Sequence, residues 1–338
     1  MLKLFILLSF VLIPVISLCQ TNLDTLNFAD CQNLRNSAER KIIIEDYNSS
    51  SKLYKNLYKN CILWNDDAYN ALYASFLSKN YENIEFFVLE LLKRGEDPDR
   101  LASSLDTFSF FISGKWLEIK SRDIEFSYDT LLRKEIIEMH KRDQNDRYDV
   151  ANRLSDDLIN LVELHRITLE RGFPTELDLG ICHENRYDVK LRVILLHLVK
   201  IQPWDFGEFL QNWYFNGKLS PAHFIRLFSN ARTCDDLQLT CFGPPATNMY
   251  IVDDVWFSCN DSDFKRINLN RKIFHLETVQ EQIQKVKFSF NNEIPWRFTP
   301  GFGTVHYNLE KYDFDSYSEE LKSDGYRIYE RRSINEEY

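Results

Sequence analysis

Six side chains in the middle of the chain could do chemistry together. They combine two carboxylates, two amides, one guanidinium and one imidazole, and they are Asp143, Gln144, Arg147, Asp157, Asn160 and His197. Carboxylate and imidazole groups can exchange protons with a substrate, whereas amide and guanidinium groups can hold a polar ligand. We therefore treat the six as a candidate catalytic or polar-ligand site.

The spacing of these residues admits three interpretations. Asp143 and Arg147 are four residues apart, so on one helix they could form a solvated ion pair worth about 0.3 kcal/mol. Asp157 and Asn160 share another face, so the polar residues could instead join two helices as a buried hydrogen-bond network without a ligand. The third interpretation is a functional site. His197 stands in an apolar helical pattern, which is typical of a buried, hydrogen-bonded histidine.

Helices are expected to position these residues. Apolar residues recur at helical spacing over most of the stretch 35–230, and most strongly over 127–172. Gly172-Phe173-Pro174 should end that pattern, since Gly adopts the left-handed cap and Pro cannot continue a helix. The stretch from Ala68 to Gly95 predicts an antiparallel helical hairpin that turns at Ser78–Asn80. Other helices are predicted at 187–200, 206–214 and from Ser220 onwards.

The sequence pattern changes after about residue 242, where turn-forming residues separate short runs of residues that favour β-strands. Strands are predicted near 249–252, 255–257, 285–290, 303–307 and 326–329. The fold class is thus mainly α, with helical hairpins and a helical domain and a small β element near the C-terminus. The predicted organisation is a signal peptide (1–19), a helical N-terminal region (20–126), a helical domain (127–280) and a β-containing C-terminal segment (281–338).

Composition limits the classes of function. The chain has 338 residues, a net charge of −10 and only 10 Gly and 9 Pro, a scarcity that favours helices. Nucleic acids and anionic membranes attract cationic proteins, so we expect no nucleic-acid partner. The chain has no Walker loop, GxGxxG or GxSxG motif, and His183-Glu184 lacks the second His of a zinc motif. The sequence therefore predicts no cofactor and no metal site.

The first 19 residues read as an export signal. Lys3 precedes an apolar run from Leu4 to Ile16, and small residues at Ser17 and Cys19 suit cleavage before Gln20. The expected location is the periplasm or the exterior, with no membrane span after cleavage. A lipoprotein anchored through Cys19 is the second alternative.

Six cysteines would remain after cleavage, which permits up to three disulfides in an oxidising compartment. Cys234 with Cys241 and Cys31 with Cys61 are the pairs that we expect first. Free, buried thiols are the alternative, because a chain of this length does not need disulfides to fold.

The order of several short motifs resembles a bacterial family of domains of unknown function that is marked by an Asp-Gln-x-x-Arg motif. Asp143-Gln144-x-x-Arg147 carries the resemblance, which covers about residues 130–276 and includes Gly172-Phe173-Pro174 and Asn270-Arg271. It adds Arg271 as a candidate ligand-binding residue. Departures at Ser229, Asn230 and Pro244 put part of any shared site in doubt. The hairpin near 68–95 also resembles a degenerate tetratricopeptide unit, without a second copy.

Two hypotheses about function follow. The first is an exported helical binding or scaffold protein, whose partner would be another exported or envelope protein or a polar ligand. The second is a hydrolase-like enzyme that uses the polar cluster of the Asp-Gln-x-x-Arg helix. We favour binding, because the sequence lacks a strong catalytic signature. The ligand, the reaction and the oligomeric state stay open.

Overall fold

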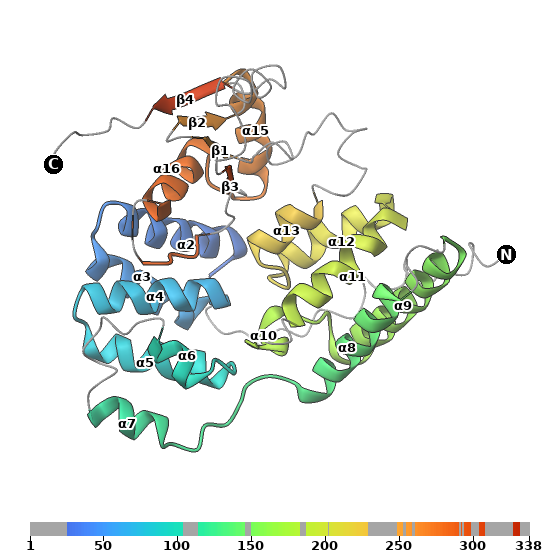
Figure 1. The fold of residues 1–338 in the computed structure, drawn as a ribbon, viewed down its shortest axis with the longest axis horizontal. Coiled ribbons are helices and arrows are strands. Elements are labelled where there is room, and N and C mark those ends of the chain that lie inside the picture. The colour runs from blue at the N-terminus through green and yellow to red at the C-terminus, as the bar shows by residue number, and fades with distance from the viewer. Residues whose placement is uncertain are drawn as a thin grey trace.

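The computed structural model describes residues 26–103, 114–145, 150–182, 187–201, 203–228, 249–252, 255–258, 261–290, 292, 294–298, 304–307 and 327–331. Within these residues the chain is mainly helical, which confirms the predicted fold class (Figure 1). The elements are α2 (Phe28–Ile43), α3 (Tyr47–Asn60), α4 (Asn65–Leu77), α5 (Tyr81–Lys93), α6 (Pro98–Ser103), α7 (Gly114–Lys120), α8 (Thr130–Gln144), α9 (Val150–Arg171), α10 (Glu176–Leu179), α11 (Tyr187–Ile201), α12 (Pro203–Phe215), α13 (Pro221–Phe228), β1 (Met249–Val252), β2 (Val255–Ser258), α15 (Asp261–Ile273), α16 (Val279–Phe290), β3 (Thr304–Tyr307) and β4 (Arg327–Arg331).

The first half of the molecule is a stack in which each of the helices α2 to α5 packs on the next (Figure 1). Short polar residues start these helices: Asn27 caps α2, Asp46 caps α3 and Asn80 caps α5, each with a side-chain oxygen that accepts a backbone N–H. One buried apolar cluster fills the stack. Its members include Ala38, Ile42, Tyr54, Leu57, Leu72, Phe87, Val88 and Leu91.

The predicted hairpin is confirmed as the helix pair α4 and α5. The turn at Ser78–Asn80 passes through Lys79, whose φ of 55° lies in the left-handed region. Helix α5 ends just before Gly95, which has a φ of 92° and so ends the helix as predicted. The resemblance of this pair to a tetratricopeptide unit stays a prediction.

The second half forms another apolar cluster around α8, α9, α11, α12 and α13. Helix α9 ends at Arg171 and Gly172 follows with a φ of 87°, which confirms the predicted end of that helix. The buried members of this cluster include Leu132, Ile136, Met139, Leu164, Ile167, Ile194, Leu198, Tyr214 and Phe224.

The short stretch from Asp178 to Ile181 ties the two halves together. The Ile181 N–H donates to the carbonyl of Arg94 at 2.6 Å, and Arg133 Nε donates to the carbonyl of Leu179 at 2.6 Å. Between them lies Gly180, where a Cβ would stand only 2.5 Å from the Arg94 oxygen. The backbones of the two halves thus meet at a glycine that leaves no room for a side chain.

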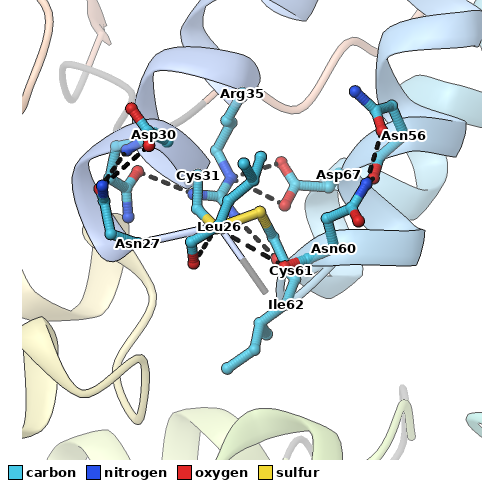
Figure 2. The surroundings of a disulfide bond; sticks show 11 residues. Leu26, Asn27, Asp30, Cys31, Arg35, Asn56, Asn60, Cys61, Ile62 and Asp67 are labelled. Atoms are coloured by element: carbon cyan, nitrogen blue, oxygen red, sulfur yellow. Dashed lines mark hydrogen bonds and ion pairs between the residues drawn. A yellow bond between two sulfur atoms is a disulfide. The ribbon is translucent and has the colours of Figure 1, made fainter. Parts of the chain in front are cut away.

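A disulfide joins Cys31 on α2 to Cys61 after α3, with their Cα atoms 5.7 Å apart (Figure 2). This is one of the two pairs expected from the sequence, whereas Cys234 and Cys241 lie outside the described residues. The Arg35–Asp67 ion pair lies beside the disulfide, with Nε 2.8 Å from a carboxylate oxygen and both side chains buried (Figure 2).

The C-terminal part packs against α2 through α16 (Figure 1). The described strands form a sheet in the order β3-β1-β2-β4, in which only the β1–β3 pair is parallel. The prediction of a strand at 285–290 was wrong, since these residues form the end of helix α16. A reciprocal cap between Thr278 and Glu281 starts the helix. Buried Lys285 on this helix contacts the carboxylates of Glu39 and Glu277.

Several predictions concern residues that the structure does not describe, and the predicted domain limits are not tested by it. The predicted signal peptide (1–19) and the family departures at Ser229, Asn230 and Pro244 lie outside them. Among the described helices, none combines the length and the apolar character that a membrane crossing requires. The two apolar clusters are compatible with several placements of a boundary, so the predicted domain limits stay a prediction.

Candidate functional site

Three helices that pack on one another, α8, α9 and α11, bring five of the six candidate residues to one region (Figure 1). On each of these helices, a polar residue lies next to the row of buried apolar residues. On α8 the buried positions Leu132, Ile136 and Met139 continue one turn later at Asp143. On α9, Asp157 and Asn160 precede the buried stripe, and on α11 His197 follows Ile194 by one turn. We call the group Asp143, Asp157 and His197 the three-helix site.

The closest pair in this site joins α8 to α11. His197 Nδ1 lies 2.8 Å from Asp143 Oδ1 and 3.0 Å from Oδ2. An ionised carboxylate can only accept, so the Nδ1–H of His197 is the donor in this bond. The Asp143 side chain is 1% exposed and that of His197 is 21% exposed, so the imidazole lies between a buried carboxyl group and the surface.

Asp157 completes the three-helix site from α9. One ligand atom from each of Asp143, Asp157 and His197 lies within 4.8 Å of the other two. Both aspartates are buried, with exposed fractions of 2% for Asp143 and 5% for Asp157. Two buried carboxylates at this separation need nearby donors or positive charge, because burial disfavours their ionised forms.

Amide groups hold the two aspartate-bearing helices together. Asn160 Nδ2 donates to the Met139 carbonyl at 3.0 Å, and Arg142 Nη1 donates to Asn160 Oδ1 at 2.7 Å. Gln144 Nε2 donates to Asp143 Oδ2. Asn160 therefore positions α9 against α8, while Gln144 orients the Asp143 carboxylate.

Arg142 is a residue of this region that the sequence interpretation missed. Its position directly before Asp143-Gln144 in a polar stretch was a weak signal, because nothing in the sequence shows that it turns toward α9.

The expectation that Asp143 and Arg147 lie on one helix was wrong. Helix α8 ends at Gln144, and Asn145 adopts an extended backbone with φ −72° and ψ 135°. The helical spacing between the two residues is therefore interrupted, and because Arg147 lies outside the described residues, its pairing with Asp143 stays a prediction. The solvated-face interpretation is also wrong for Asp143, because this carboxylate is buried.

Arg271 occupies a different place in the fold. It lies in the last turn of α15, where its Nε donates to the carbonyl of Glu277, and it is fully buried. Burial lowers the pKa of Arg271 to about 10, although Glu277 opposes this change. Its described contacts are with the turn between α15 and α16, and the three-helix site does not include it.

Comparison with known proteins gives no relative from which an activity could be transferred. No protein-family model matches the chain, and no curated protein or solved structure shows significant similarity to it. The resemblance to the Asp-Gln-x-x-Arg family therefore stays a prediction, and the chemistry must be argued from the site itself.

Proposed function

We propose that this chain is an exported helical binding protein that holds a polar ligand at the three-helix site. The convergence of Asp143, Asp157 and His197 from three different helices is the observation that carries the proposal. Chain segments far apart in sequence meet there, and each contributes a polar group from the end of an otherwise apolar stripe. Such a convergence of buried titratable groups is typical of ligand and active sites.

The disulfide supports the exported location. Disulfides form and persist outside the reducing cytoplasm, and Cys31–Cys61 links two helices of the first half. The predicted signal at residues 1–19 points to the same compartment. We therefore place the working protein in the periplasm or the exterior.

The kind of group in the site favours a small polar ligand over a partner protein. Protein interfaces typically bury about 800 Å² per partner and depend on apolar anchors. The three-helix site instead offers a few carboxylate and imidazole atoms within 4.8 Å of one another. A compact group of this kind suits a cation or a small ligand with hydrogen-bond donors.

A hydrolase-like enzyme is the second candidate, and the Asp143–His197 contact favours it. A buried carboxylate bonded to Nδ1 fixes the tautomer and the orientation of the imidazole. His197 would then act as the general base through its other ring nitrogen. Replacing His197 with Gln should abolish hydrolysis of any substrate found in an ester and phosphoester panel while the melting temperature changes little.

Thermal denaturation of the full exported chain with a panel of polar ligands tests the binding proposal. The panel contains divalent cations, phosphate, amino acids and sugars. A ligand of the site should raise the melting temperature of the wild type but not that of Asp157→Asn. Asp156→Asn is the matched control, because the neighbouring carboxylate on the same helix is half-buried and lies outside the three-helix site.

Two outcomes would count against the proposal. If no ligand stabilises the wild type, or if each stabilising ligand acts equally on Asp157→Asn, the three-helix site does not bind it. The polar residues would then form a network that only joins the helices.

A further inference from the structure

We infer that the ligand of the three-helix site is a divalent transition-metal cation, with Zn²⁺ as the probe. This inference rests on the proposed function, since it names the ligand class of the same site. The sequence carries no motif for such a site, and the residues that form it come from three separate stretches of the chain.

The separation between Asp143 and His197 matches that of two ligands of one ion. Two atoms that are each about 2.1 Å from a cation lie about 3.0 Å apart in cis positions of an octahedron, and about 4.2 Å apart in trans positions. His197 Nδ1 lies 2.8 and 3.0 Å from the two Asp143 oxygens, which is the cis separation. Since one atom of Asp157 is also within 4.8 Å of both, small side-chain rotations would bring all three onto one ion.

Charge favours a cation at this place. Asp143 and Asp157 are buried, and each carboxylate raises the free energy of ionising the other. A doubly charged ion between them would offset that repulsion and the loss of solvation. On binding, the neutral imidazole of His197 would change its tautomer: Nδ1 would give its proton to solvent while Nε2 takes one up, and the lone pair of Nδ1 would then coordinate the metal.

The donor set selects among cations. Mg²⁺ and Ca²⁺ prefer oxygen ligands alone, whereas an imidazole with two carboxylates suits Zn²⁺ and related transition-metal ions. Three protein ligands leave at least one coordination position for water or a substrate atom. His197 is 21% exposed, so that open position would face the more accessible edge of the site.

The supporting side chains resemble the outer shell of a metal site. Gln144 donates to Asp143 Oδ2, which leaves Oδ1 of this carboxylate for the ion. Asn160 and Arg142 fix the spacing between α8 and α9, so the two carboxylates are held at one separation. Such outer contacts typically change metal affinity by about 10- to 100-fold.

Isothermal titration of the untagged, full exported chain with ZnCl₂ tests this inference. The wild type and Asp156→Asn should each bind one Zn²⁺ per chain, whereas Asp157→Asn should bind about tenfold or more weakly. Glu138→Gln on α8, an exposed carboxylate 64% accessible, is a second control and should also bind as the wild type does. Circular dichroism of each variant shows whether the helices are retained.

The outcomes separate this inference from the proposed function. If the wild type does not bind Zn²⁺, or if Asp157→Asn binds it with equal affinity, the inference that the ligand is a transition-metal cation is overturned. If a different polar ligand then stabilises the wild type but not Asp157→Asn, the site binds a ligand that is not a transition metal. If neither happens, both proposals are overturned. A higher affinity for Mg²⁺ than for Zn²⁺ would contradict the assignment of the ligand to the transition-metal ions.

Discussion

Asp143 and His197 lie 54 residues apart in sequence and hydrogen bond with each other in the structure. Their residue types could be predicted as candidates, because carboxylate and imidazole groups can exchange protons with a substrate. Their contact could not be predicted, since it depends on how α11 packs across α8. The same limit explains why Arg142 was missed and why Arg271, another buried polar residue, was grouped with them. Buried polar side chains are informative only once their partners are known.

Glu176 is a second buried carboxylate with an unusual environment. It starts α10, and its Oε1 accepts the backbone N–H of Asn65 at 2.9 Å. Burial raises the pKa of Glu176 to about 8, and the nearby carboxylates of Asp66 and Asp188 add to this effect. The side chain is 10% exposed and also lies 3.7 Å from His223 Nδ1.

Glu176→Gln should change how stability depends on pH. The folded-state pKa of about 8 lies above the unfolded value near 4.5, so the protonated carboxyl stabilises the fold below pH 4.5. This contribution is lost as the pH rises from about 4.5 to about 8. The free energy of unfolding of the wild type should therefore fall across this window relative to Glu176→Gln, by on the order of 5 kcal/mol.

Urea denaturation of both proteins at a series of pH values measures that difference. Because the Gln side chain can still accept the Asn65 N–H, the variant should fold normally. Parallel stability curves for the two proteins between pH 4.5 and pH 8 would show that Glu176 does not take up a proton on folding.

Helix α16 shows why a strand was wrongly predicted at residues 285–290. Lys285 to Phe290 alternate polar and apolar residues, which is typical of a strand, yet Val279 and Ile283 are four apart and both are buried. The Thr278-x-x-Glu281 cap was the signal that would have predicted a helix start. In contrast, the ends of α5 and α9 were predictable, because Gly95 and Gly172 determine them locally. A short alternating pattern is therefore a less reliable predictor of secondary structure than residues that start or end a helix.

The Cys31–Cys61 disulfide links the start of α2 to the end of α3, across a sequence separation of 30 residues. Replacing both cysteines with Ser should destabilise the protein by about 3–4 kcal/mol, because a crosslink of that loop length restricts the unfolded chain. Chemical denaturation of the oxidised wild type and the double variant measures the difference.

The reduced wild type is the control for this prediction. It should unfold at nearly the same denaturant concentration as the double Ser variant, since both lack the crosslink. If reduction leaves the midpoint unchanged, the disulfide does not stabilise the protein.

At the scale of the whole molecule, two apolar clusters meet through the stretch 178–181. Gly180 lies at their junction with a φ of 62°, and the carbonyl of Arg94 and the guanidinium of Arg133 surround it. The sequence predicted helices in both halves but gave no signal for this junction. Contacts between distant backbone segments depend on tertiary packing, so the periodicity of either half does not contain them.

Gly180→Ala should destabilise the protein far more than Gly172→Ala. Both glycines have positive φ, and an Ala in that conformation costs about 1 kcal/mol. At Gly172 a Cβ would meet nothing within 4 Å, whereas at Gly180 it would stand 2.5 Å from the Arg94 oxygen. Gly180→Ala must therefore move the two halves of the molecule apart.

Thermal unfolding with far-ultraviolet circular dichroism checks this pair of variants. Gly172→Ala should unfold in one transition close to the wild type, and Gly180→Ala at a clearly lower temperature. Equal melting temperatures for the two variants would show that the junction is not tightly packed.

The central claim is that α8, α9 and α11 together build a ligand site, and that its ligand is a cation. Anomalous diffraction from a crystal of the protein grown with Zn²⁺ tests it most directly. The account predicts a peak within about 2.3 Å of a carboxylate oxygen of both Asp143 and Asp157 and of His197 Nδ1. A crystal with no peak there, in which His197 keeps its hydrogen bond to Asp143, would contradict it.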